Sequence, residues 1–145
     1  MKEYAKNNKE HLREYKSNWF NEKYSTDPQF RLQSNFSVQM RICIKNKNRI
    51  SVFNLVTYTK QQLMKHLEKQ FDNNMTWKNY GSYWHIDHII PKNFFNFSSY
   101  KDEDFKRCWA LVNLQPLKIS ENYSKQDKLP TNYKEILVEI NEEIK

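Results

Sequence analysis

One short stretch carries most of the information about this fold: Tyr83-Trp-His-Ile-Asp-His-Ile-Ile-Pro91. It is aromatic and β-branched and a proline follows it, so we predict a strand that stops before Pro91. Two histidines and an aspartate lie within four positions of this strand. Carboxylate oxygens are preferred ligands of divalent ions that act on phosphates, and neutral imidazole accepts a proton near neutral pH. Asp87 and His88 therefore place a potential metal ligand and a potential base side by side.

Strand geometry opposes this pairing in one respect. Adjacent side chains of a regular strand point to opposite faces, so Asp87 and His88 converge only if the strand ends or bends there. Pro91 favours such an end. From these residues alone a second interpretation stays open, in which His88 is a buried, hydrogen-bonded histidine and Asp87 is a surface carboxylate.

The sequence downstream adds a second strand and a helix with polar side chains. Residues 114–119, within the run that begins Asn113-Leu-Gln-Pro-Leu117, predict the strand, and Ser120 is expected to cap a short helix that ends near residue 128. On that helix Asn122 offers a neutral oxygen ligand and Lys125 offers a point charge suited to a phosphate. Positions three apart share a helix face, so both side chains can approach one ligand.

Taken together and in this order, the three motifs resemble the HNH endonuclease family, whose core is the ββα-metal, or His-Me, finger. The resemblance is greatest to the stand-alone members found in phages and other large DNA viruses. It is strong over residues 71–128 and loose over the first 60 residues. The family implies a metal-dependent endonuclease that hydrolyses DNA phosphodiester bonds.

The resemblance also implies roles for the central residues. His88 would be the general base that activates the attacking water. Asp87 and Asn122 would hold one divalent ion, Mg²⁺ or Mn²⁺. Because the helix carries Asn122 where a histidine is often found, the sequence argues against the zinc-preferring, histidine-rich subclass.

Three further residues receive supporting roles from the same resemblance. Asn113 would brace the loop after the first strand and so help to aim His88. Lys125 would contact a phosphate. His85 is either a further metal or phosphate contact or a packed strand residue.

The basic residues are unevenly distributed along the chain. The net formal charge is +7, and residues 1–69 hold 14 Lys or Arg against 6 Asp or Glu, whereas residues 70–145 hold 10 against 11. Such asymmetry favours a polyanion-binding surface in the first half, although a merely solvated surface is the alternative. We expect the backbone of duplex DNA to be contacted by Arg31, Arg41, Lys45, Lys47 and Arg49.

Hydrophobic periodicity predicts helices around this centre. Apolar residues at helical spacing indicate helices over 12–19, after Asp27-Pro28 and over 136–144, and residues 50–59 look β-rich. Thr59-Lys-Gln-Gln62 has the form of a capping box. The predicted fold class is α+β: a helical, basic DNA-binding segment over residues 1–60, and an HNH finger with a C-terminal helix over residues 61–145.

Composition restricts the setting in which the protein works. Cys43 and Cys108 are the only cysteines and no C-x-x-C is present, so we expect two reduced thiols rather than a disulfide framework or a zinc knuckle. No stretch approaches the roughly 20 apolar residues of a membrane span. We expect an intracellular, cytoplasmic protein, in the host cell if it is viral, that acts as a monomer or homodimer.

Two alternatives to a DNA endonuclease stay open. The first is a catalytically decayed module that keeps the fold and binds DNA without cutting it. The second is an RNA-cleaving or structure-specific nuclease with the same finger. The intact set Asp87, His88, Asn113 and Asn122 argues against decay.

Overall fold

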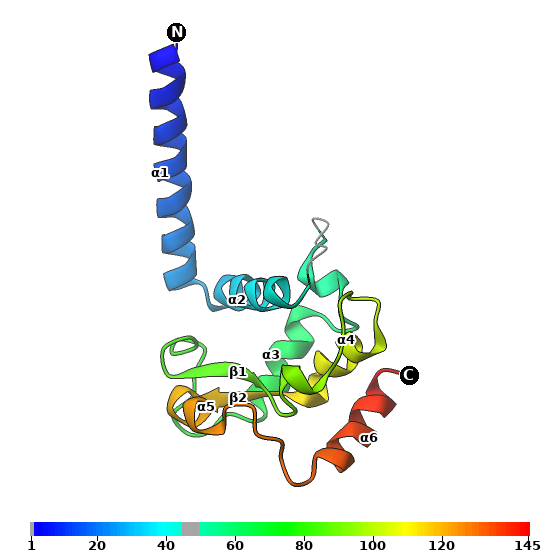
Figure 1. Cartoon of the computed structure of the whole chain (residues 1–145). Coiled ribbons are helices and arrows are strands. Elements are labelled where there is room, and N and C mark those ends of the chain that lie inside the picture. Colours follow the sequence, from blue (N-terminus) through cyan, green and yellow to red (C-terminus); the bar gives the residue numbers. More distant parts are fainter. Residues whose placement is uncertain (1, 45–49) are drawn as a thin grey trace.

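A computed structural model describes residues 2–44 and 50–145. In this part of the chain the protein is mostly helical, with one small antiparallel sheet of two strands (Figure 1). The predicted α+β class is confirmed at this level. No helix within residues 2–44 and 50–145 combines the length and the apolar character needed to cross a bilayer. The α-helices are α1 (Lys2–Thr26), α2 (Pro28–Cys43), α3 (Lys60–Glu68), α4 (Glu103–Cys108), α5 (Ile119–Lys125) and α6 (Tyr133–Glu143), and the strands are β1 (Trp84–His88) and β2 (Leu114–Lys118).

The junction between α1 and α2 follows from two residues. Asp27 has extended backbone angles, and its carboxylate accepts hydrogen bonds from the amides of Gln29 (3.0 Å) and Phe30 (3.2 Å). Pro28 stands at the first helical position, where its missing N–H costs nothing. The predicted helix start is therefore confirmed, and α1 leaves the body at a steep angle to α2 (Figure 1).

Arg31 fastens this junction to the rest of the molecule. The residue is only 8% exposed. Its guanidinium donates to the carbonyls of Tyr24 (2.7 Å), Ser25 (2.7 Å), Tyr80 (3.0 Å) and Lys78 (3.3 Å). It joins the end of α1 to the loop before β1, and its donors are used inside the protein. The expectation that Arg31 grips DNA is therefore corrected to a structural role.

The hydrophobic core spans the predicted boundary at residue 60. Leu32, Phe36 and Met40 form the apolar stripe of α2 and are buried, and the ring of Phe36 packs edge-on against Trp109 at a centroid distance of 5.0 Å. Leu63 and Leu67 of α3 belong to the same cluster. Residues from both sides of the boundary thus share one core.

The sheet pairs β1 with β2 in antiparallel register, from Trp84 opposite Lys118 to His88 opposite Leu114. Both predicted strands are confirmed, with shorter bounds than expected. Helix α5 begins immediately after β2, and its N-cap is Lys118 without a side-chain hydrogen bond, so the predicted Ser120 cap is wrong. The order strand, connection, strand, helix is as the sequence indicated.

The expected β-rich run at residues 50–59 is corrected by the structure. It contains a 3₁₀ turn at Val52–Asn54 and irregular backbone instead of a strand. Val52 is buried in the core, and the hydroxyl of buried Tyr58 donates to the carbonyl of Trp109 (2.7 Å). These side chains reflect core contacts rather than strand pairing, because β-propensity largely measures packing. The capping box after this run, between Thr59 and Gln62, is confirmed.

Candidate active site

Four residues singled out in the sequence line one cleft, where the end of β1 meets α5. The cleft has a volume of about 370 Å³. Asp87 and His88 come from β1, and Asn122 and Lys125 come from α5. The remaining lining residues are Gln39, Ile86, Pro91, Lys92, Gln126 and Asp127.

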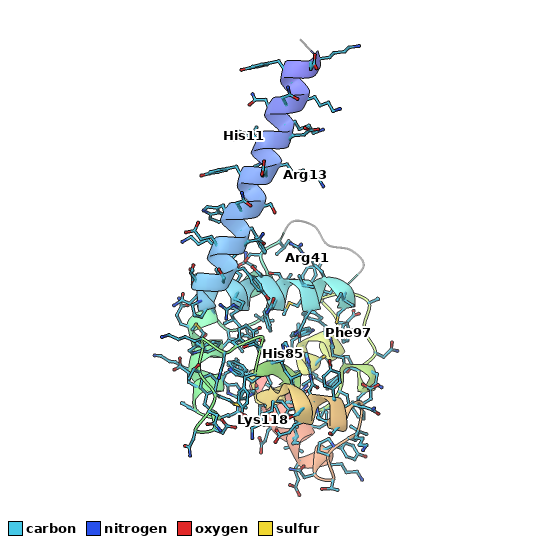
Figure 2. The ribbon with its side chains drawn as sticks, turned by 90° about the vertical axis from the view of Figure 1, so that its left-hand side faces the viewer. His11, Arg13, Arg41, His85, Phe97 and Lys118 are labelled. Carbon is cyan, nitrogen blue, oxygen red and sulfur yellow. The ribbon has the colours of Figure 1, made fainter. Side chains whose placement is uncertain are left out.

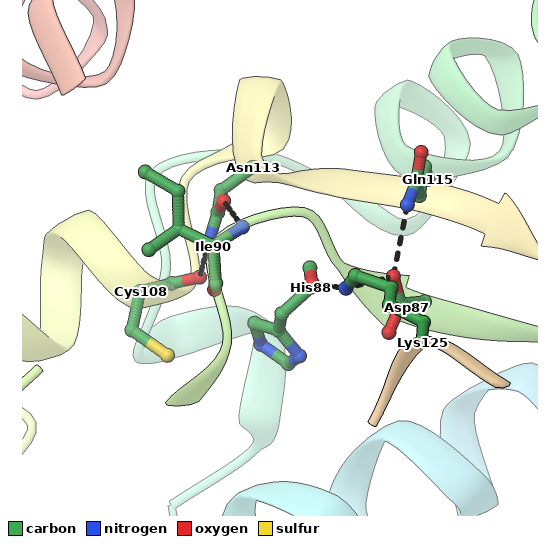
Figure 3. Close-up of polar contacts among 7 residues, drawn as sticks. All are labelled: Asp87, His88, Ile90, Cys108, Asn113, Gln115 and Lys125. Atoms are coloured by element: carbon green, nitrogen blue, oxygen red, sulfur yellow. Dashed lines mark hydrogen bonds and ion pairs between the residues drawn. The ribbon is translucent and has the colours of Figure 1, made fainter. Parts of the chain in front are cut away.

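The carboxylate of Asp87 is held by two donors (Figure 3). Lys125 Nζ lies 2.6 Å from Asp87 Oδ2, and Gln115 Nε2 lies 2.9 Å from the same oxygen. Gln115 stands directly opposite Asp87 in the sheet. Lys125 Nζ also donates to the carbonyl of His88. The side chains of Asp87 and Lys125 are 11% and 19% exposed, so this ion pair is mostly shielded from water.

The imidazole of His88 is buried and uncharged. The residue is 5% exposed, and its ring packs edge-on against Trp109 at a centroid distance of 4.5 Å. Burial, assisted by the positive charges of Lys92 and Lys125, lowers the pKa of His88 to about 3. Its Nε2 is buried and has no hydrogen-bond partner within the described residues. Buried polar atoms are nearly always paired, which makes this nitrogen a candidate for contact with a ligand.

The geometric objection to pairing Asp87 with His88 holds for the directions of the two side chains. Burial alternates along the strand, so the side chains leave it on opposite faces. His88 is the last residue of β1, and both residues nevertheless border the same cleft.

Asn113 is fully buried and ties together the loop that follows β1 (Figure 3). Its Oδ1 accepts from the amide of Ile90 (2.8 Å), and its Nδ2 donates to the carbonyls of Ile90 (3.2 Å) and Cys108 (2.9 Å). Its main-chain carbonyl accepts from the amide of Ile89 (2.8 Å). These bonds fix the backbone one and two residues beyond His88.

The donor set of the cleft suits a hard divalent cation. Asp87 contributes carboxylate oxygens, and half-buried Asn122 contributes an amide oxygen from the facing helix. Within the described ranges, no three His, Cys, Asp or Glu side chains are grouped to hold a metal. An ion held by Asp87 and Asn122 would therefore complete its shell with water or substrate oxygens, as Mg²⁺ commonly does.

Other predicted residues lie elsewhere. His85, labelled in Figure 2, is half-buried opposite Leu117, and burial lowers its pKa. It is not among the residues that line the cleft. Arg41 is exposed and lines a different hollow, beside Gln33 and Ser37. The other three predicted DNA contacts, Lys45, Lys47 and Arg49, lie outside the described residues.

The structure adds four polar residues to the cleft that sequence reasoning did not select: Gln39, Lys92, Gln126 and Asp127. Lys92 lies four residues after His88 and directly after Pro91. Its closeness in sequence to His88 could have indicated that it belongs to the cleft. Asp127 lies five residues beyond Asn122, and its place in the motif could also have indicated it. Gln39 comes from α2, far away in sequence, and no local pattern points to it.

Comparison with known proteins identifies two viral relatives, both named as uncharacterized proteins. The chain is 46% identical over 63 residues to "Uncharacterized protein L426" of Acanthamoeba polyphaga mimivirus, a match that covers 43% of this chain and 27% of the relative. It is 26% identical over 121 residues to "Uncharacterized protein L246" of the same virus, covering 83% of this chain and 53% of the relative. The chain thus matches about a quarter and about half of the lengths of these relatives. No family model and no solved structure matches.

Proposed function

We propose that this protein is a metal-dependent HNH endonuclease that hydrolyses DNA phosphodiester bonds. The observation that carries the proposal is the convergence of Asp87, His88 and Asn122 in one cleft built by strand, strand and helix. In this proposal β1, β2 and α5 form the ββα-metal finger.

His88 acts as the general base. Its imidazole is neutral, and Nε2 has a free lone pair or proton site that no described residue occupies. A base with a pKa nearer neutrality is more effective, and a phosphate bound beside Lys92 and Lys125 would raise the pKa of His88 by offsetting their charges. Asn113 positions His88 by fixing the loop behind it.

Asp87 and Asn122 hold one divalent ion, Mg²⁺ or Mn²⁺. When bound, such an ion stabilises the negative charge that develops on the phosphate oxygens during hydrolysis. Lys92 and Lys125 add fixed positive charge to the same cleft, which attracts the substrate phosphate. A single cleft cuts one strand at a time, so cleavage of both strands requires a homodimer or two binding events.

Relaxation of a supercoiled plasmid tests this function. Wild type is compared with His88→Ala, with Mg²⁺ or Mn²⁺ and with a chelator, and His85→Ala serves as the control from the same strand outside the cleft. We expect metal-dependent relaxation by wild type and His85→Ala, with a loss of about 10²–10⁴-fold in His88→Ala. Cleavage by His88→Ala at the wild-type rate would refute the role of His88 as general base. Metal-dependent cleavage of RNA or branched DNA alone would overturn the assignment of duplex DNA as substrate.

A further inference from the structure

Helix α1 carries its positive charge on one face. Every Lys and Arg of this helix falls on a single series of positions, spaced by four, three, four, three and seven residues. Spacings of three, four and seven place side chains on the same side of an α-helix. We call this set the α1 basic face: Lys2, Lys6, Lys9, Arg13, Lys16 and Lys23.

The acidic residues of α1 lie away from this face. Glu3, Glu10 and Glu14 follow one another at spacings of seven and four and centre about 100° around the helix from the basic series, with Glu10 at its edge. Glu22 lies further round, about 150° from the centre of the basic series. Among the described residues, no carboxylate forms an ion pair with the α1 basic face. His11 and Arg13 extend on different sides of the helix (Figure 2). The charge is therefore both segregated and unneutralised.

The basic face is also exposed along its whole length. All residues from Lys2 to Lys23 are exposed, and α1 buries none of its side chains. The helix stands out from the body and contacts it only near its C-terminal end (Figure 1). A helix that is polar on all sides and extends into solvent is stabilised either by many ion pairs within the helix or by contact with another molecule or domain.

Charge complementarity points to a polyanion whose charges recur over a long distance. From Lys2 to Lys23 the face spans about 30 Å, and duplex DNA carries one negative charge per about 1.7 Å of its axis. The duplex thus offers several phosphates to each cation along the face. The cleft of Asp87 and His88 would require the same partner.

A lipid surface fits this helix less well. The apolar side chains on or beside the basic face are Tyr4, Ala5, Leu12, Tyr15, Trp19 and Phe20, so Leu12 is the only large aliphatic one and two of the aromatic ones carry a hydroxyl. Asn8 lies within the same stripe. Helices that lie in a membrane interface need a broad, strongly apolar face in addition to their cations.

We propose that the α1 basic face binds the phosphate backbone of duplex DNA and holds it next to the body of the protein. The choice of DNA rests on the proposed nuclease function. The sequence had placed the DNA contacts later in the chain, from Arg31 onward, and this assignment moves the main electrostatic contact to α1. Phosphate contacts of this kind position the protein without reading base sequence.

The test measures binding of the full chain to a duplex of about 20 base pairs, longer than α1, without divalent metal over a range of salt concentrations. The test variant combines Lys6→Gln, Lys9→Gln, Arg13→Gln and Lys16→Gln. Glutamine has a helix propensity close to that of lysine and arginine, so α1 is preserved, and circular dichroism checks this. The control variant removes the same charge from exposed body lysines: Lys101→Gln, Lys106→Gln, Lys134→Gln and Lys145→Gln.

Each neutralised phosphate contributes about 0.9 to the slope of log affinity against log salt. We expect the slope of the test variant to be shallower by about 2 to 4 and its affinity at low salt to fall at least about tenfold, with little change in the control. An unchanged slope, or equal losses in both variants, would overturn the proposal. So would binding to anionic phosphatidylserine vesicles that depends on these four residues while DNA binding does not.

The readout is binding, so the two proposals fail separately. If the wild type cuts no substrate but loses DNA affinity with the α1 charges, the nuclease proposal fails and the α1 assignment stands. If the wild type cuts DNA and the test variant binds as tightly as wild type, the α1 assignment fails and the nuclease proposal stands.

Discussion

Lys125 places its ammonium group 2.6 Å from Asp87 Oδ2 and also donates to the carbonyl of His88, so one cation bridges the two neighbouring residues at the end of β1. The oxygen that it contacts belongs to the carboxylate we assign to a divalent ion. Under the proposed metal assignment, Lys125 and the ion would therefore compete for Asp87. Movement of Lys125 toward a substrate phosphate would release the carboxylate when substrate arrives.

Replacing Lys125 with alanine should strengthen binding of Mn²⁺ to the protein in the absence of DNA. Removing a positive charge so close to the ligand favours the cation, and we expect a gain of about tenfold in affinity, or about 1.4 kcal/mol. Isothermal titration calorimetry measures it, with Lys128→Ala as an exposed control beyond the same helix. Weaker Mn²⁺ binding by Lys125→Ala would contradict the competition. Asp87→Ala should abolish binding at the site.

Asn113→Ala should destabilise the fold. It leaves the buried amide of Ile90 and the carbonyl of Cys108 without partners, at a cost of about 2–4 kcal/mol. Urea unfolding measures the change. Asn122→Ala is the matched control, because Asn122 is only half-buried and should change stability by less than about 0.5 kcal/mol while still reducing cleavage. Equal stability of the Asn113 variant and wild type would refute the bracing role.

Arg31→Lys should loosen the attachment of α1. A lysine ammonium is a single compact donor group and cannot span the four carbonyls that the guanidinium reaches, so we expect a loss of about 2–3 kcal/mol in unfolding free energy. Hydrogen exchange at residues 24–26 and 78–80 should rise. Arg41→Lys, at an exposed position, serves as the control. If exchange in those segments stays at the wild-type rate, the attachment does not depend on Arg31.

The two thiols should differ in reactivity. Burial raises the pKa of the Cys108 thiol, which is fully inaccessible, whereas Cys43 is partly exposed. Because the thiolate is the reactive form, Cys43 should react first with a disulfide reagent and Cys108 only on unfolding. Time courses of the Cys43→Ser and Cys108→Ser variants assign each phase. Rapid reaction of both thiols in the native protein would contradict the burial of Cys108.

Acid should remove the stabilising contribution of Asp102. Hydrogen bonds from the amides of Ser98 and Ser99 lower the pKa of this carboxyl in the folded protein. A group whose folded pKa is lowered stabilises the fold above its unfolded pKa, and the contribution is lost as pH falls through the folded value. The stability difference between wild type and Asp102→Asn should therefore shrink between about pH 5 and pH 2. A difference that stays constant over this range would contradict it.

The centre of the fold was predictable because its information is local. The strands, α5 and the cleft residues on them lie in contiguous motifs, and the capping groups at Asp27 and Thr59 act within three residues of themselves. Such short-range rules depend only on neighbouring side chains. For the same reason Gln39 could not be assigned to the cleft, since only tertiary packing brings α2 there.

The structural role of Arg31 and the irregular backbone of residues 50–59 could not be predicted from the sequence. Both depend on tertiary contacts that the hydrophobic pattern does not record. Arg31 lies off the apolar stripe of α2 and so looked solvent-facing, yet main-chain carbonyls surround it. The side chains of residues 50–59 have strand propensity, but tertiary burial of Val52 and Tyr58 determines their conformation.

Helix α1 contacts the body only near its C-terminal end, so a small change of angle there becomes a large displacement at Lys2. It is about 37 Å long, so a rotation of about 10° at Asp27, where the next helix begins, would move Lys2 by about 6 Å. The described part of α1 before Tyr24 has no residue in the lining of the cleft between β1 and α5. Under the proposal that the α1 basic face binds DNA, such a rotation would let the far end of α1 follow duplexes of different curvature without moving a cleft residue.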